Sequence, residues 1–141
     1  MLARRELSEA QVRERLVRRG HDQSAIDPAV SRLLAERAID DGRLADAIAQ
    51  TEVARQRRGR RRVTQRIESI GITRSTARRA VNDAFAAVDE GALLEAALAR
   101  RLRAGHMIAD EAELRRLYRF LVVRGFESDA VMRALRTRSV K

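Results

Sequence analysis

Arginines are concentrated in one short segment of the chain, and their guanidinium groups are its most distinctive functional groups. Five of the six positions from 57 to 62 are arginine, and a further arginine follows about one helical turn later. Guanidinium groups match phosphate oxygens in both geometry and charge, so this segment is a candidate nucleic-acid site. The predicted binding residues are Arg57, Arg58, Arg60, Arg61, Arg62 and Arg66.

The same segment opens an amphipathic helix that buries Val63 and Ile67 and ends at Gly71. Cations in the first turn of a helix cost roughly 0.3–1 kcal/mol each, because the unpaired N–H groups already make that end positive. Two explanations stay open. A partner's phosphate at the helix N-terminus relieves the penalty, or acids elsewhere neutralise a solvated face. The candidate acids are Asp40, Asp41 and Asp46.

The burial of Val63 and Ile67 places the helix's polar residues in a predicted stripe on its far side. That stripe consists of Arg62, Arg66 and Ser69, with Arg61 and Gln65 alongside.

Residues for catalysis or metal binding are sparse. The chain has no cysteine and two histidines, and neither histidine has a second histidine nearby in sequence. His21 is predicted to pack just past a helix end, and Tyr118 to lie at the core edge. Adjacent carboxylates precede helices, where capping explains them. We therefore expect no catalytic residue, no metal, no cofactor and no enzyme activity.

Composition points to a polyanionic partner. The 141 residues carry a formal charge of +10 and a pI near 11.5, and all but one of the thirty basic residues are arginine. No apolar run is long enough for a membrane span, and the N-terminal residues lack the apolar region of a secretory signal. A soluble cytoplasmic protein that does not contact membranes is expected.

Hydrophobic periodicity predicts an all-α protein of about eight helices. Apolar residues recur at helical spacing, and aromatic residues make up only 3% of the chain. The clearest helix start is Ser8, which forms a capping box with Gln11. Other predicted caps are Asp27 with Pro28 at the first helical position, Asp40 or Asp41, Asp110, and Ser128.

Three glycines mark an internal repeat. Aligning Gly20, Gly71 and Gly125 superimposes the apolar positions around them, so the chain reads as tandem three-helix units. The predicted units are 1–58, 59–109 and 110–141, the last with two helices. Because such units stack on their neighbours, we expect an elongated or curved row with a continuous thin core, a basic concave face and a monomeric state.

Four blocks together resemble the RecX family of bacterial regulators of the RecA recombinase. They are "SEAQVRERLVRRG", "AIDDGRLADAIAQ", "RRGRRRVTQRIESIGI" and "LYRFLVVRGF", and the resemblance runs from about Ser8 to Arg136. It implies a non-enzymatic modulator that lies in the groove of the RecA filament on single-stranded DNA. Such a modulator lowers ATPase and strand-exchange activity in recombination, DNA repair and the SOS response.

Two other functions remain open. The positive charge alone suffices for a general DNA-binding repeat protein, and a row of helices also offers a groove for an acidic or amphipathic peptide. Binding to naked DNA as tight as to the filament would favour the first, and binding that survives high salt without DNA would favour the second.

Overall fold

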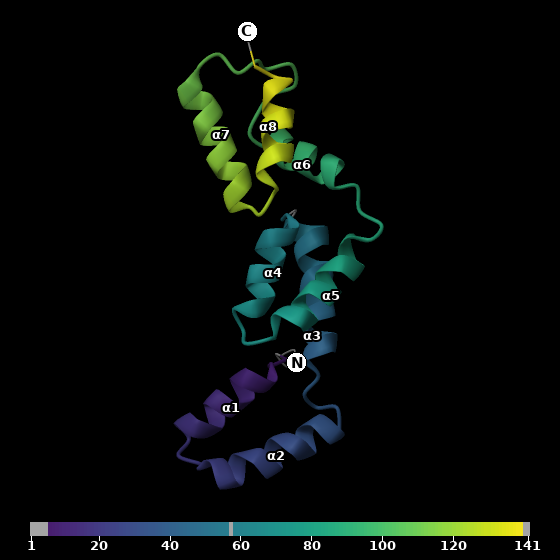
Figure 1. Ribbon diagram of the computed structural model, residues 1–141, viewed down its shortest axis with the longest axis vertical. Coiled ribbons are helices and arrows are strands. Elements are labelled where there is room, and N and C mark those ends of the chain that lie inside the picture. The colour runs from purple at the N-terminus through teal and green to yellow at the C-terminus, as the bar shows by residue number, and fades with distance from the viewer. Residues whose placement is uncertain (1–5, 57, 140–141) are drawn as a thin grey trace, which may run out of the picture.

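The chain is an elongated row of α-helices in this computed structural model, which describes residues 6–56 and 58–139 (Figure 1). The described part contains eight α-helices and no strand, apart from an isolated parallel bridge between Ile108 and Ser139. The helices are α1 (Glu9–Arg18), α2 (Gln23–Ala35), α3 (Asp41–Thr51), α4 (Arg60–Glu68), α5 (Arg74–Phe85), α6 (Glu90–Ala99), α7 (Glu111–Val123) and α8 (Ser128–Arg136). The predicted all-α fold is confirmed.

Most helix starts follow from local capping chemistry. Ser8 and Gln11 form the predicted capping box, and the side chains of Asp40 and Asp110 accept N–H bonds at the starts of α3 and α7. Glu127, rather than Ser128, is the N-cap of α8.

The start of α2 was predicted wrongly. Asp22 caps this helix by accepting a hydrogen bond from the Ala25 N–H, so it begins one turn before Asp27, and Pro28 lies inside it. A proline in the second turn removes one backbone hydrogen bond, and the Asp22 cap offsets part of that loss.

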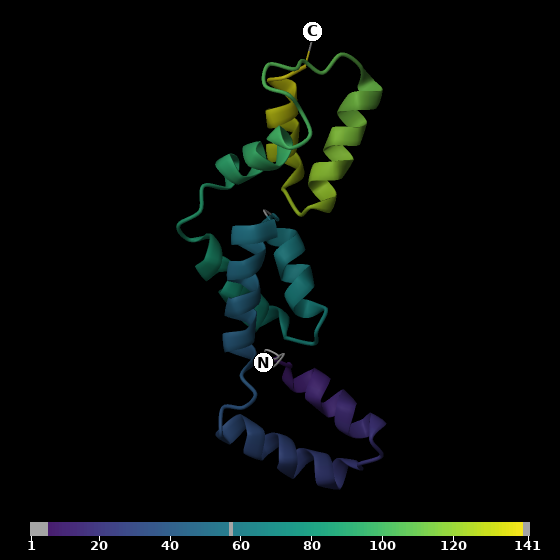
Figure 2. The same cartoon turned by 180° about the vertical axis from the view of Figure 1, so that it is seen from behind.

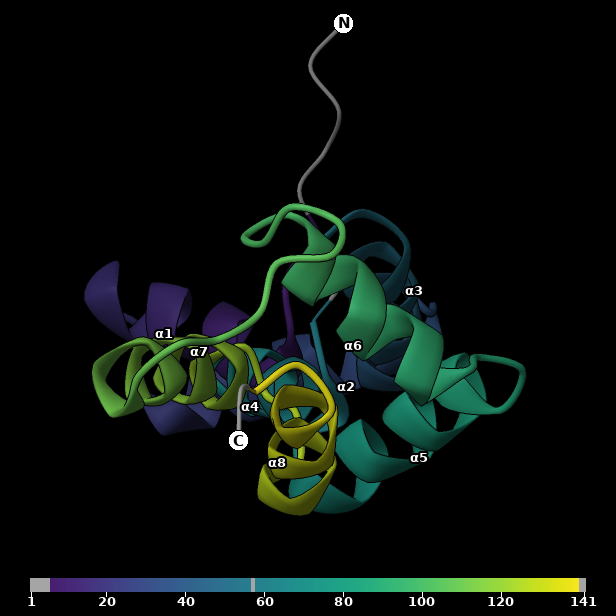
Figure 3. The same ribbon diagram turned by 90° about the horizontal axis from the view of Figure 1, so that it is seen from above.

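Three hydrophobic clusters divide the row. The first joins α1, α2 and Ile39, the second joins α3, α4 and α5, and the third joins α6, α7 and α8. Figure 2 shows the same three groups from behind, and Figure 3 shows them from above, with α6, α7 and α8 nearest the viewer. The expected continuous core is therefore interrupted, and Leu93 is the apolar residue that touches both the second and the third cluster.

The cores and the sequence repeat are offset by one helix. The repeat as predicted, 1–58, 59–109 and 110–141, starts each unit at α1, α4 or α7, whereas α3 packs with the two helices that follow it and so does α6. A five-residue π-helix, η1 (Glu52–Gln56), extends α3 toward α4. The packed groups with three helices thus consist of a leading helix and a helical hairpin.

Hydrogen bonds to backbone carbonyls join the three groups end to end. The N–H groups of Gly59 and Arg61, at the start of α4, donate to the carbonyls of Arg124 and Gly125 at the end of α7. In the same way, the Ser8 hydroxyl at the start of α1 donates to the Ile70 carbonyl at the end of α4. Each joint therefore sets a positive helix start against a negative helix end.

Tyr118 lies where the sequence predicts, and His21 does not. Tyr118 is partly buried against the third cluster, which confirms its place at the core edge. His21 is exposed, whereas its aligned residues Ile72 and Phe126 are buried, so its predicted packing role is wrong. Among the described residues, no helix packs on α1 and α2 in the way that α3 packs on α4 and α5.

Candidate nucleic-acid interface

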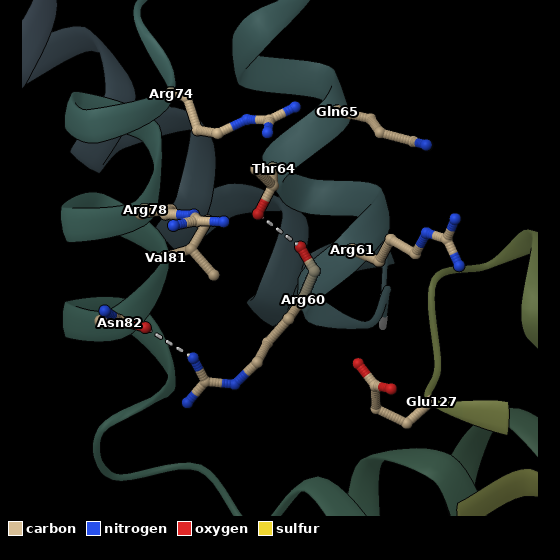
Figure 4. A pocket seen from close by; sticks show the side chains of 9 residues that line it. All are labelled: Arg60, Arg61, Thr64, Gln65, Arg74, Arg78, Val81, Asn82 and Glu127. Carbon is tan, nitrogen blue, oxygen red and sulfur yellow. Dashed lines mark hydrogen bonds between the residues drawn. The ribbon is translucent and has the colours of Figure 1, made fainter. Parts of the chain in front are cut away.

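A cleft of about 590 Å³ lies between α4 and α5 and reaches the N-terminal end of α8 (Figure 4). Arg61 and Gln65 stand one turn apart on α4, and Arg74 and Arg78 stand one turn apart on α5. Because residues four apart share a helix face, the two helices present these side chains to the same space. The lining residues are Arg60, Arg61, Thr64, Gln65, Arg74, Arg78, Val81, Asn82 and Glu127.

The cleft carries more positive charge than its own carboxylates balance. Arg61 and Arg78 are exposed, and neither has an ion-pair partner among the described residues. Arg74 pairs with Glu68 at 3.4 Å but stays largely in solvent. Glu127 is the acid that lines this space. A phosphate entering the cleft meets three guanidinium groups, which bind anions through charge-assisted hydrogen bonds.

Arg60 holds the helices together. Its Nη1 donates to Asn82 Oδ1 at 2.7 Å, its Nε lies 3.1 Å from Glu90 Oε1, and its guanidinium lies 5.1 Å from the centre of the Phe85 ring. These contacts tie α4 to α5 and to the start of α6. This predicted binding residue therefore also orders the wall of the cleft.

Glu52 in η1 is the acid that faces two of the predicted arginines. Its carboxylate lies 3.2 Å from Arg58 Nη1 and 4.0 Å from Arg66 Nε, and the residue is 9% exposed. An acid does neutralise part of the arginine cluster, as predicted, but it is Glu52 and not Asp40, Asp41 or Asp46. Glu52 reaches the cluster because α3, which η1 extends, packs against α4, and local sequence patterns do not reveal this packing.

The acids that were predicted have other partners. Asp46 lies 3.5 Å from Arg79, and Asp41 Oδ1 accepts a hydrogen bond from the Glu9 N–H at 2.9 Å. Asp40 caps α3 by accepting from the Arg43 N–H at 3.0 Å. All three therefore stabilise helix starts or helix contacts away from the arginine cluster.

The N-terminus of α4 is not open to a phosphate. The N–H groups of Gly59 and Arg61 donate to the carbonyls of α7 over 2.9 and 3.4 Å, which provides the compensation that the arginine-rich start requires. The hypothesis of a phosphate at this helix end is therefore wrong. Any anion in the cleft is bound by side chains instead.

The predicted polar stripe on α4 divides between two sides. Arg61 and Gln65 line the cleft, whereas Arg66 faces Glu52 and the backbone of Arg62 lies against Gly125. Arg57, which was also predicted to bind, lies outside the described residues. Of the predicted set, Arg60 and Arg61 are brought together in one cavity.

A second group of cations surrounds Phe120 near the joint of α4 and α7. Arg101 and Arg124 lie 4.2 and 5.3 Å from the centre of its ring. Burial lowers the pKa of Arg124, and the positive charges of Arg58, Arg100 and Arg101 lower it further. An anion beside these residues would offset their mutual repulsion.

Arg74 and Arg78 were not among the predicted binding residues. The available signal was their spacing of four residues in "RSTARR", which puts both on one face of a predicted helix. What spacing does not reveal is that this face turns toward α4.

Other kinds of site are not visible in the part of the chain that the structure describes. Among residues 6–56 and 58–139, no cluster of three or more His, Asp or Glu residues is arranged to hold a metal ion. Nor does any helix in these ranges have the length and apolar character needed to cross a bilayer.

The fold and the cleft define a class: an all-helical tandem-repeat protein with an arginine-lined interface. Models of the first and third three-helix domains of RecX match residues 1–33 and 89–135. A protein named Regulatory protein RecX from Halorhodospira halophila is 34% identical over 134 residues, which cover 95% of this chain and 81% of that protein. The chain therefore belongs to the RecX family.

Further comparisons agree with this assignment. The Regulatory protein RecX of Syntrophotalea carbinolica is 33% identical over 91% of this chain and 84% of its own length. The crystal structure of RecX from Lactobacillus salivarius superimposes with a TM-score of 0.72 over 94% of this chain and 88% of that one. At 16% identity, that likeness speaks for the fold alone. Family membership supports a regulatory role.

Proposed function

We propose that this protein is a non-enzymatic regulator that binds the RecA filament on single-stranded DNA and lowers its ATPase and strand-exchange activities. It acts in the cytoplasm as a monomer, without a cofactor. Membership of the RecX family supports the regulatory role, and the elongated row of helices suits a partner that is itself extended.

The observation that carries the DNA part of the proposal is the cleft between α4 and α5. Arg61 and Arg78 face a common space without a carboxylate partner among the described residues, and Arg74 stands beside them. Like charges four residues apart on one helix, such as Arg74 and Arg78, cost a few tenths of a kcal/mol in the free protein. A phosphodiester backbone in the cleft converts that repulsion into attraction.

The residues proposed to contact DNA differ from those predicted from the sequence. Arg61 contacts phosphate directly, Arg74 and Arg78 join it, and Arg60 positions the wall of the cleft. Arg58, Arg62 and Arg66 belong to the face that meets η1 and α7, where Glu52 already offsets part of their charge. They add to the general positive field that attracts DNA from a distance.

The first test is the ATPase rate of RecA on single-stranded DNA, titrated with this protein below one copy per RecA. We expect inhibition at substoichiometric ratios, because one regulator on a cooperative filament affects many subunits. Normal ATPase and strand exchange at a protein concentration that saturates DNA binding would refute regulation of RecA and leave a general DNA-binding protein.

The second test separates the cleft from the protein's overall charge. The triple variant Arg61→Ala, Arg74→Ala, Arg78→Ala removes three positive charges from the cleft. The matched control Arg115→Ala, Arg116→Ala, Arg119→Ala removes three exposed charges from α7. Because each lost contact with a single-strand phosphate changes the salt slope by about 0.7, the cleft variant should flatten the dependence of log K on log salt by about 2. Equal slopes in the two variants would contradict the cleft assignment.

A further inference from the structure

Two guanidinium groups lie over one aromatic ring in the third group. The Cζ atoms of Arg101 and Arg124 are 4.2 and 5.3 Å from the centre of the Phe120 ring. Arg101 follows the end of α6, whereas Phe120 and Arg124 belong to the end of α7, so tertiary packing brings these side chains together. We call Phe120, Arg58, Arg100, Arg101 and Arg124 the Phe120 cluster.

The cluster collects positive charge from three segments of the chain. Arg100 is the C-cap of α6, and Arg58 comes from the segment that precedes α4. Burial lowers the pKa of Arg124, and the charges of Arg58, Arg100 and Arg101 lower it further. The four guanidinium groups therefore repel one another in the free protein.

Acidic side chains compensate little of this repulsion. Arg58 pairs with Glu52 at 3.2 Å. Arg100 and Arg101 are exposed, and neither has an ion-pair partner in the part of the chain that the structure describes. The negative C-terminal end of α6 favours the charge of Arg100. The helix dipole does not explain Arg101, whose guanidinium lies over the ring.

Phe120 holds Arg101 in an orientation that suits an anion. A guanidinium group is attracted to an aromatic face and stacks on it through its own flat side. The N–H donors lie at the edge of the guanidinium plane, so stacking leaves them free to form two parallel hydrogen bonds with phosphate oxygens. The ring thus positions a donor group without neutralising its charge.

We propose that the Phe120 cluster is a second phosphate-binding site, in which Arg100 and Arg101 donate to phosphate oxygens and Phe120 positions Arg101. The ligand is a chain of phosphate groups, because several adjacent cations favour several linked anions. Both an inorganic polyphosphate and a nucleic-acid backbone have this chemistry. None of the cluster residues lines the cleft between α4 and α5 (Figure 4). The site therefore depends neither on the cleft nor on regulation of RecA.

The first experiment measures binding of two probes to the full chain: inorganic tripolyphosphate, and an oligothymidylate of about fifteen nucleotides. The variant Arg100→Ala, Arg101→Ala removes two charges from the cluster. The matched control Arg115→Ala, Arg116→Ala removes two exposed charges from α7. We expect the cluster variant to bind at least one probe roughly tenfold more weakly than the control does. Equal affinities of the two variants for both probes would overturn the proposal.

The two probes also identify the source of the phosphate. Weaker binding of tripolyphosphate alone assigns the site to free polyphosphates. Weaker binding of the oligothymidylate, with a salt slope flatter by about 0.7 for each lost phosphate contact, assigns it to a nucleic-acid backbone.

The cleft variant Arg61→Ala, Arg74→Ala, Arg78→Ala separates this site from the proposed DNA-binding cleft. It should keep the phosphate binding that the Phe120 cluster provides, and adding Arg100→Ala and Arg101→Ala should remove that remainder. If the cleft variant by itself abolished the binding of both probes, the cluster would not be a separate site and the proposal would be overturned.

The stacked geometry is tested without a change in net charge. Arg101→Lys keeps the charge but loses the planar donor group, and it should weaken binding roughly threefold. Arg103→Lys is the matched control, because Arg103 is exposed and also follows α6. Phe120→Leu should have a similar effect and add little to Arg101→Lys, since both variants remove the same stacked contact. Equal binding by the two lysine variants would overturn the role of stacking, and so would additive losses.

Discussion

At the joint of α7 and α4 two glycines meet, whereas at the joint of α4 and α1 a serine and an alanine meet one glycine. A Cβ on Gly59 would come within 2.5 Å of the Gly125 carbonyl oxygen, so the first joint leaves no room for a side chain at Gly59 or at Gly125. At the second joint, Ala10 lies against Gly71, and the buried Ser8 hydroxyl reaches the Ile70 carbonyl.

The two joints differ in how the free N–H groups at the start of α4 and of α1 find hydrogen-bond acceptors. Gly59 offers no side-chain cap for α4, so the free N–H groups there depend on the carbonyls of α7. Ser8 caps α1 by itself and donates its hydroxyl to the neighbouring group as well. Docking of the third group therefore supplies hydrogen bonds that the α4 start lacks locally, whereas the α1 start is stabilised both locally and by docking.

A third helix end of the same kind, at Gly20, has no other helix packed against it in the part of the chain that the structure describes. Gly20 ends α1 with φ of +91°, close to the +88° of Gly71 and the +98° of Gly125, yet among the described residues no atom beyond its two chain neighbours lies within 4 Å of the place where its Cβ would be. Substituting these three glycines therefore separates two destabilising effects. Strain from the left-handed backbone conformation is common to all three, whereas collision of the new Cβ with a neighbouring helix is expected at Gly71 and Gly125 and not at Gly20.

Gly125→Ala should have the largest effect on stability. The new Cβ would meet the Arg62 backbone nitrogen and lie 2.5 Å from Arg62 Cβ, in a backbone conformation that L residues rarely adopt. Together, overpacking and backbone strain should cost roughly 2–4 kcal/mol, measured by urea unfolding. Gly20→Ala is the control, and it should lose only about 1 kcal/mol because it carries the backbone term alone. Equal losses would show that the α7–α4 joint is not tightly packed.

Gly71→Ala should rank second, because its Cβ would collide with Ala10 Cβ across the α4–α1 joint. We expect a loss of roughly 2 kcal/mol, part of it from the left-handed backbone. Adding Ala10→Gly should restore the part that comes from the collision, so the double variant should approach the loss seen for Gly20→Ala. A double variant no more stable than Gly71→Ala would contradict a direct contact between the two residues.

Ser8→Ala should give the smallest of the three effects, about 1–2 kcal/mol. It removes the N-cap of α1 and leaves the Ile70 carbonyl without its hydroxyl donor. Hydrogen exchange should accelerate at the first turn of α1 while α7 and α8 stay unchanged, because they lie beyond the other joint. Faster exchange throughout the chain would mean that the groups unfold as one unit.

Much of the local structure could be predicted because it depends on near neighbours in sequence. Ser8 with Gln11, and Asp40 and Asp110 as caps, act within one turn of the chain, and the apolar spacing around Val63 and Ile67 specifies a buried helix face. The predicted start of α2 was wrong because two acids, Asp22 and Asp27, are both suitable N-caps, and local chemistry does not choose between them.

The candidate site was predictable only in part. Arg61 and the positive charge of α4 follow from the sequence, but Arg74 and Arg78 join them only because α5 packs beside α4. Glu52, rather than Asp40 or Asp46, faces Arg58 because Glu52 lies at the end of α3 that meets the start of α4. These partners are separated by several residues or by whole helices, and periodicity carries no information about such pairs.

The sequence alone determined the number of helices, their buried faces, the three repeated glycines and the resemblance to RecX. Each of these rests on spacing within about one or two turns, or on repetition along the chain. Only the tertiary structure decided that α3 and α6 pack forward onto the next hairpin and that the carbonyls of α7 compensate the positive start of α4. The reason is physical: packing and electrostatics act through space, between residues that the chain brings together only when it folds.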